Sequence, residues 1–362
     1  MRTRRLALIA MLVALLIASS VYVATGLRVF ANYRHTYGAY ALACDGTLAW
    51  NPPRALYAGL YVNQSSFVTV RVRSSTPTLA YVTVAIPGYS AGQQLELQTG
   101  ATFQSLDFKP QLITAQNTGE EASARTNTLV AAAVVAKGRP TCTLNAPLTI
   151  FGRQWMRWRD PATHEDLTPY IAGWVTPQSP LVATLAGKAA GRLRDHPELY
   201  DNLPALFGYD QGSATGGQVR DQVNAIFDTL QFEYHVRYSA DNPPFTSDSA
   251  QIVLSPDDIL GASAPTGMCV ETTALIASAV ERLGMRPYIV FTATHAYLGV
   301  ALSDTANGPI AYWETSDLNG SALGAQANVD GDATYAQDVT THAITDVVDI
   351  QAERAHGIAP SQ

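Results

Sequence analysis

The chain has 362 residues, of which 47% are hydrophobic and 15% charged, so its composition suits a folded core and excludes general disorder. At about 100–200 residues per domain, this length predicts two domains. The net charge of -7, without a basic patch interleaved with aromatic residues, argues against nucleic acid as a partner. Three cysteines without CxxC spacing are too few for a disulfide scaffold and do not indicate zinc.

The N-terminus predicts export. Three arginines among the first five residues precede a charge-free run from Leu6 to Leu27. As a helix, this run would be about 33 Å long, which is enough to span a bilayer core. The arginines should stay in the cytoplasm, so the protein would cross the cell membrane once, with the bulk of the chain extracytoplasmic. Residues 18–20 (Ala-Ser-Ser) resemble a cleavage site, so residues 1–28 are either a signal-anchor or the signal peptide of a secreted protein.

Residues 29–155 are predicted to form an immunoglobulin-like β-sandwich. Four short alternating or apolar stretches read as strands: 67–73, 79–86, 94–98 and 128–135. Cys44 and Cys142 bracket this region. In an exported protein they would be able to form a disulfide, and the alternative is a pair of buried free thiols.

Ser90 lies in a match to the GxSxG pattern of serine hydrolases, at residues 88–92. That pattern requires a helix after the serine, which holds the serine on a strand-to-helix elbow. Residues 94–98 alternate as a strand instead. The segment is therefore expected to be a turn between sandwich strands.

Helical periodicity begins near residue 180. Apolar residues recur at four-residue spacing from Leu181 to Leu193, and the pattern returns over 219–230. Residues 156–350 are expected to form an α+β catalytic domain, and 351–362 a polar tail.

Cys269 is predicted to lie at the N-terminus of a helix. One apolar face of that helix is formed by Leu275, Ile276, Ala279, Val280 and Leu283. Gly284 follows, where a C-terminal cap belongs. The unpaired N–H groups and the positive dipole end at a helix start favour thiolate, the reactive form of cysteine.

An imidazole and a carboxylate follow on two strands. His295 opens an apolar strand, and Glu314 closes the next strand after a turn rich in Asp, Asn and Gly. If Leu302 pairs with Asn307, Glu314 lies directly opposite His295, with Cβ atoms about 4.5–5.5 Å apart. A carboxylate there would orient the imidazole as the third member of a catalytic triad. Asp317 is the alternative acid.

Four segments together resemble the transglutaminase-like superfamily, in particular bacterial members whose third motif reads Glu-Thr-Thr. They are Gly267-x-Cys269, a helix ending in Leu283-Gly284, His295-Ala296-Tyr297 and Glu314-Thr315-Ser316. The similarity covers roughly residues 215–320 and a stretch at 173–177. It implies a papain-like thiol fold in which Cys269 is the nucleophile, His295 the general base and acid, and Glu314 the orienting acid. The expected fold class is thus α+β, with a transmembrane helix and a β-sandwich preceding this domain.

The backbone N–H of Cys269 should help to stabilise an oxyanion. Gln251 is either a second donor to that oxyanion or a solvated loop glutamine.

The expected function is acyl transfer at amide bonds by an exported thiol enzyme. Resolution of the thioester by water would make a peptidase or amidase, which is preferred, and resolution by a lysine amine would make a protein transglutaminase. The substrate would be a protein or peptide amide, including amides of the cell wall. No cofactor is expected, and the scattered histidines, without HExxH, indicate no metal. The alternative is a catalytically silent scaffold that binds an extracytoplasmic partner.

Overall fold

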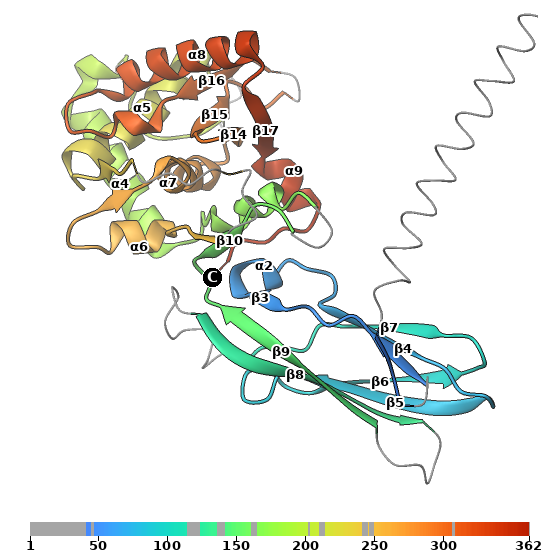
Figure 1. Cartoon of the computed structure of the whole chain (residues 1–362). Helices are drawn as coiled ribbons and strands as arrows, with labels where there is room; N and C mark the ends of the chain where they lie inside the picture. The colour runs from blue at the N-terminus through green and yellow to red at the C-terminus, as the bar shows by residue number, and fades with distance from the viewer. Residues whose placement is uncertain are drawn as a thin grey trace, which may run out of the picture. The chain divides into compact units, whose positions relative to one another are not determined.

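The computed structural model describes residues 41–44, 47–113, 124–135, 142–160, 165–201, 203–209, 214–240, 245, 250–305 and 308–361 (Figure 1). The chain forms two compact units. The first comprises residues 1–54, 66–113 and 127–148, and the second comprises 55–65, 114–126 and 149–362.

The predicted fold class is wrong in placing a membrane-spanning helix ahead of the two domains. None of the helices formed by the described residues is both long and apolar enough to cross a bilayer. The central helix α7 (Cys269–Arg282), for example, has 14 residues, which as a helix reach only about 21 Å of the roughly 30 Å hydrocarbon core. Residues 1–28, on which the prediction was based, lie outside the described part. The fold class that the structure supports is mixed α+β with several sheets.

The first unit contains two antiparallel layers. One sheet has the order β1 (Ala41–Ala43), β2 (Leu48–Trp50), β4 (Val68–Val72) and β7 (Gln104–Phe108). The other runs through β9 (Cys142–Phe151), β8 (Ala124–Val135), β5 (Thr78–Ala85) and β6 (Gln93–Thr99). Alternate residues are buried, as the period of a strand requires: Val68, Val70 and Val72 on β4, and Ala80, Val82 and Val84 on β5. All four strand predictions are confirmed.

Cys44 and Cys142 form a disulfide with Cα atoms 6.0 Å apart. Cys44 lies in the turn after β1, and Cys142 is the first residue of β9. The two thiols are therefore bonded rather than free, and Cys269 is the one free cysteine of the chain.

Ser90 has a structural role. It is buried, its Oγ accepts a hydrogen bond from the backbone N–H of Ile86 at 2.8 Å, and it forms an isolated bridge to Leu112. The next element is the strand β6 rather than a helix. The prediction of a turn in place of a hydrolase elbow is confirmed.

The second unit is built around an antiparallel sheet. Its order is β16 (Ile310–Trp313), β15 (Ala296–Ala301), β14 (Pro287–Thr292) and β17 (Ile344–Asp349). On one face, side chains such as Phe291 and Leu298 join the core that contains α7. On the other face, Val290, Tyr297 and Tyr312 pack with Tyr335 of α8 (Gly324–Thr341). The sheet thus lies between α7 and α8 (Figure 1).

Helix α7 is buried on all sides rather than along one face as predicted. Every residue from Cys269 to Val280 is buried. Besides β14 and β15, the helix contacts α4 (Pro180–Asp195), α5 (Gly216–Phe232) and α6 (Pro256–Leu260). The periodicity that predicted α4 and α5 is confirmed. A helix enclosed in this way has its ends fixed by packing, which suits a site placed at one end.

The remaining elements of the second unit are short. They are β3 (Ala55–Tyr57), α2 (Ala58–Tyr61), β10 (Trp155–Arg157), η1 (Thr168–Trp174), η2 (Pro197–Leu199), β11 (Arg237–Tyr238), β12 (Ala250–Ile252), β13 (Thr266–Gly267), η3 (Thr315–Asp317) and α9 (Ile350–Ala355).

Candidate active site

Cys269 is the first residue of α7, with Met268 as the N-cap. The predicted position at a helix start is confirmed, and Gly284 has the positive φ of 74° expected after the helix end. The first N–H groups of a helix have no partner within it, so they favour a negative charge at this end. The Cys269 side chain is nevertheless fully covered, with 0% of the residue exposed.

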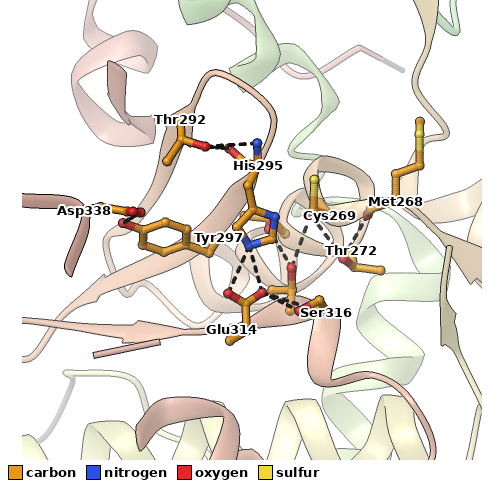
Figure 2. A network of polar contacts seen from close by, with 11 residues as sticks. Met268, Cys269, Thr272, Thr292, His295, Tyr297, Glu314, Ser316 and Asp338 are labelled. Atoms are coloured by element: carbon orange, nitrogen blue, oxygen red, sulfur yellow. Dashed lines mark hydrogen bonds and ion pairs between the residues drawn. The ribbon is translucent and has the colours of Figure 1, made fainter. Parts of the chain in front are cut away.

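His295 lies in the turn between β14 and β15, one residue before β15 begins. Two backbone-directed hydrogen bonds hold it there. Thr292 N–H donates to the His295 carbonyl at 2.8 Å, and His295 N–H donates to Thr292 Oγ1 at 3.1 Å. The Tyr297 ring lies beside the imidazole, with centroids 5.9 Å apart, and its hydroxyl donates to Asp338 (Figure 2). The backbone of His295 is therefore held by Thr292, and its imidazole ring packs beside the ring of Tyr297.

Glu314 follows β16 and caps η3. Its carboxylate oxygens lie 3.0 and 2.9 Å from His295 Nε2, and Ser316 donates to Oε1 from its N–H and its hydroxyl (Figure 2). The carboxylate is largely buried, so these contacts replace the solvent that it has lost. The motif Glu314-Thr315-Ser316 thus supplies both the acid and the group that orients it.

The register predicted for β15 and β16 is wrong by two residues. Ala301 pairs with Ile310, and Leu302 N–H donates to the Pro309 carbonyl, so Asn307 is not the partner of Leu302. Side chains alternate between faces with a period of two, so a shift of two residues keeps the same side chains on the same face. Glu314 therefore reaches His295 diagonally instead of from the directly opposed position.

With Nε2 turned to Glu314, the other side of the imidazole faces Cys269 (Figure 2). Burial lowers the pKa of His295, but hydrogen bonds and charge interactions with Cys269 and Glu314 outweigh burial and raise it to about 10. For Glu314, burial raises the pKa, whereas its contacts with His295 and Ser316 outweigh burial and lower it. The arrangement favours an imidazolium ion between two acceptors.

We expect His295 to remain protonated through neutral pH and to titrate near pH 10 instead of 6.5, as followed by NMR of its ring nitrogens. Because folding raises the pKa of His295, protonation of this residue stabilises the folded state. This contribution to the free energy of unfolding is fully present below pH 6.5 and is lost as the pH rises through about 10. Glu314→Gln should move the titration toward lower pH, because it removes one negative acceptor. A wild-type titration near pH 6.5 would contradict the described contacts.

Thr315 joins the segment that bears Glu314 to the first turn of α7, a role that was not predicted from the sequence. Its buried hydroxyl lies 3.0 Å from Thr273 Oγ1 and 3.3 Å from the carbonyl oxygen of Cys269. The first turn of α7 and the residue after Glu314 are thereby held together. The relative placement of sulfur and carboxylate depends on this contact.

Asp317, the alternative acid, lies elsewhere. Burial and the neighbouring carboxyl of Asp330 raise the pKa of Asp317 to about 6. The carboxylate within hydrogen-bond distance of His295 Nε2 is that of Glu314. The geometry therefore favours Glu314 as the partner of the imidazole.

Gln251 is buried rather than solvated, with 6% exposed, so its interpretation as a solvated loop residue is wrong. Its Oε1 accepts a hydrogen bond from Trp158 Nε1 at 2.8 Å, which fixes the orientation of the amide. Its buried Nε2 has no hydrogen-bond partner among the described residues. Such a donor is available for an acceptor outside the described residues.

The larger of the two described cavities lies away from the triad. It has a volume of about 630 Å³, and its lining includes Trp174, Thr176, Ser179 and Asp257 but none of the triad residues. Within the described ranges, no three His, Cys, Asp or Glu side chains gather in a way that could hold a metal ion. The Cys269 sulfur itself is covered in this structure.

Comparison with known proteins gives no family assignment. No protein-family model matches the chain, and no curated protein matches it either.

Proposed function

We propose that this protein is a thiol enzyme that transfers acyl groups from amides. One observation carries the proposal: the His295 ring lies between the Cys269 side chain and the Glu314 carboxylate. The resemblance of the surrounding motifs to the transglutaminase-like superfamily agrees with it. The Cys44–Cys142 disulfide supports an exported location, because disulfides persist in oxidising compartments.

In the first step, the Cys269 thiolate attacks the amide carbonyl carbon and a carbon–sulfur bond forms. The carbon–nitrogen bond then breaks as the His295 imidazolium gives its proton to the departing amine. Water next attacks the thioester, His295 accepts one of its protons, and the acid leaves as the thiolate is regenerated. An amine in place of water would give transamidation. Hydrolysis is the preferred outcome, with a peptide or protein amide as substrate.

Glu314 keeps the imidazole oriented and stabilises its protonated form. The backbone N–H of Cys269 and the Nε2 of Gln251 would donate hydrogen bonds to the carbonyl oxygen as negative charge develops on it.

The test begins with a small acyl donor, because the sulfur is covered. Incubation with 4-nitrophenyl acetate should acetylate Cys269, as located by mass spectrometry of peptides. A screen for release of amines from peptides and cell-wall fragments, with Cys269→Ala as control, then identifies the substrate. Absence of acylation at Cys269 together with absence of amide cleavage would reject the proposal.

Full burial of Cys269 specifically favours the second candidate, a silent scaffold, since buried cysteines are usually inert. A scaffold would show a thiol that reacts slowly at every pH and does not depend on His295.

A further inference from the structure

Glu271 is a buried carboxylate two residues after the nucleophile, with 2% exposed. Its Oε2 accepts a hydrogen bond from Met268 N–H at 2.7 Å, and its Oε1 accepts one from Leu254 N–H, also at 2.7 Å. Met268 directly precedes Cys269, and Leu254 follows β12, which carries Gln251. One side chain thus joins the segment before the sulfur to the segment that bears a buried amide donor.

Electrostatics alone does not account for this position. A carboxylate in the first turn complements the helix dipole, but its charge opposes a thiolate nearby. An exposed side chain would serve the dipole without desolvation. Burial raises the pKa of Glu271, although its two backbone hydrogen bonds oppose that rise. The cost of burying a carboxylate beside the nucleophile therefore has to be offset by a contribution other than its interaction with the helix dipole.

The segment before Cys269 is closely packed, which makes its position sensitive to this contact. A Cβ added to Gly267 would lie 3.1 Å from Thr272 and 3.3 Å from Ile259 side-chain atoms. Ser239 N–H donates to the Gly267 carbonyl at 2.8 Å. With Glu271 holding Met268 from the helix side, the backbone entering Cys269 is fixed on several sides.

We propose that Glu271 is a positioning residue, which holds the backbone at Met268 so that the Cys269 sulfur meets His295, and at the same time holds the Gln251 segment in place. This inference rests on the proposed function and adds a residue to its machinery. Glu271 does not touch the reacting atoms.

The test uses the rates of Cys269 alkylation by iodoacetamide at pH 6 and pH 9. A thiolate paired with imidazolium reacts at both pH values, whereas an ordinary thiol reacts roughly 200-fold more slowly at pH 6. A change in access to the sulfur alters both rates alike, so their ratio reports the pairing alone. The measurement needs no substrate.

Glu271→Gln keeps the shape and removes the charge. Both partners of Glu271 are N–H donors, so a glutamine can accept from only one and turns its own NH₂ toward the other. Positioning predicts that the pH 6 to pH 9 rate ratio falls by about tenfold. A purely electrostatic role predicts that the ratio stays equal or rises, which would overturn the proposal.

Glu271→Asp is the second variant, since it keeps the charge but shortens the reach. Positioning predicts a lower ratio here too, and an unchanged ratio in both variants would reject it. Glu281→Gln is the matched control, because Glu281 lies at the other end of α7 and pairs with Arg354 at 3.0 Å. Its ratio should equal the wild-type value. If wild-type alkylation itself does not depend on His295, the proposed function fails rather than the role of Glu271.

Discussion

Replacing His295 by alanine should slow the alkylation of Cys269 at pH 6 by about 100-fold, while the rate at pH 9 changes by only a few fold. The imidazolium is the group that stabilises a thiolate at low pH, and the pKa of His295 is raised to about 10, so it carries its charge throughout this range. Without it, the sulfur becomes a simple thiol whose reactivity follows its own deprotonation. The measurement is iodoacetamide labelling followed by mass spectrometry.

The chain is suited to this experiment. Cys44 and Cys142 are bonded to each other, so Cys269 is the one free thiol of the chain and labelling reports on it alone. His356→Ala is the matched control, because its imidazole is largely exposed and pairs with Glu353 at 3.3 Å. It should leave both rates unchanged. Equal pH profiles for wild type and His295→Ala would mean that sulfur and ring do not act as a pair.

The parts of the site that were predicted from sequence are those encoded locally. The period of apolar residues and Gly284 defined α7 and placed Cys269 at its start, and the strands carrying His295 and Glu314 were also identified. The error of two residues in their register came from the turn, whose geometry is not determined by composition. The predicted contact between Glu314 and His295 was still correct, because side chains alternate between the two faces of a strand and a shift of two residues returns Glu314 to the same face.

The contacts that hold these residues in place were not predicted. Thr273 and Thr315 are 42 residues apart in sequence, and Glu271 reaches back 17 residues to Leu254. A threonine or a glutamate carries no local mark of such a partner. The same limit explains Gln251, whose burial depends on the packing of Trp158, 93 residues earlier in the chain. Pairings between distant segments have to be seen in three dimensions.

Glu314→Gln should reduce the turnover of 4-nitrophenyl acetate at Cys269 by about 100-fold or more, within the range that acid–base groups contribute. The amide matches the carboxylate in shape but has no charge to stabilise the imidazolium. With its oxygen toward Ser316, its NH₂ group takes the place of Oε2 beside His295 Nε2. Ser316, which donates two hydrogen bonds to Oε1, would keep the side chain in place. The loss should therefore reflect charge and not a displaced group.

The comparison that decides the identity of the acid is Asp317→Asn, measured in the same assay. Asp317 is three residues further along and beside Asp330, and the carboxylate on Nε2 belongs to Glu314, so this variant should stay within about threefold of wild type. Glu314 also has a lowered pKa, so its contribution to stability is present at neutral pH and is lost as the pH falls through its folded value. The difference in unfolding free energy between wild type and Glu314→Gln should consequently shrink in acid. A large loss of turnover in Asp317→Asn with little loss in Glu314→Gln would assign the orienting role to Asp317, and the hydrogen bonds at Nε2 would then describe a resting arrangement that the reaction does not use.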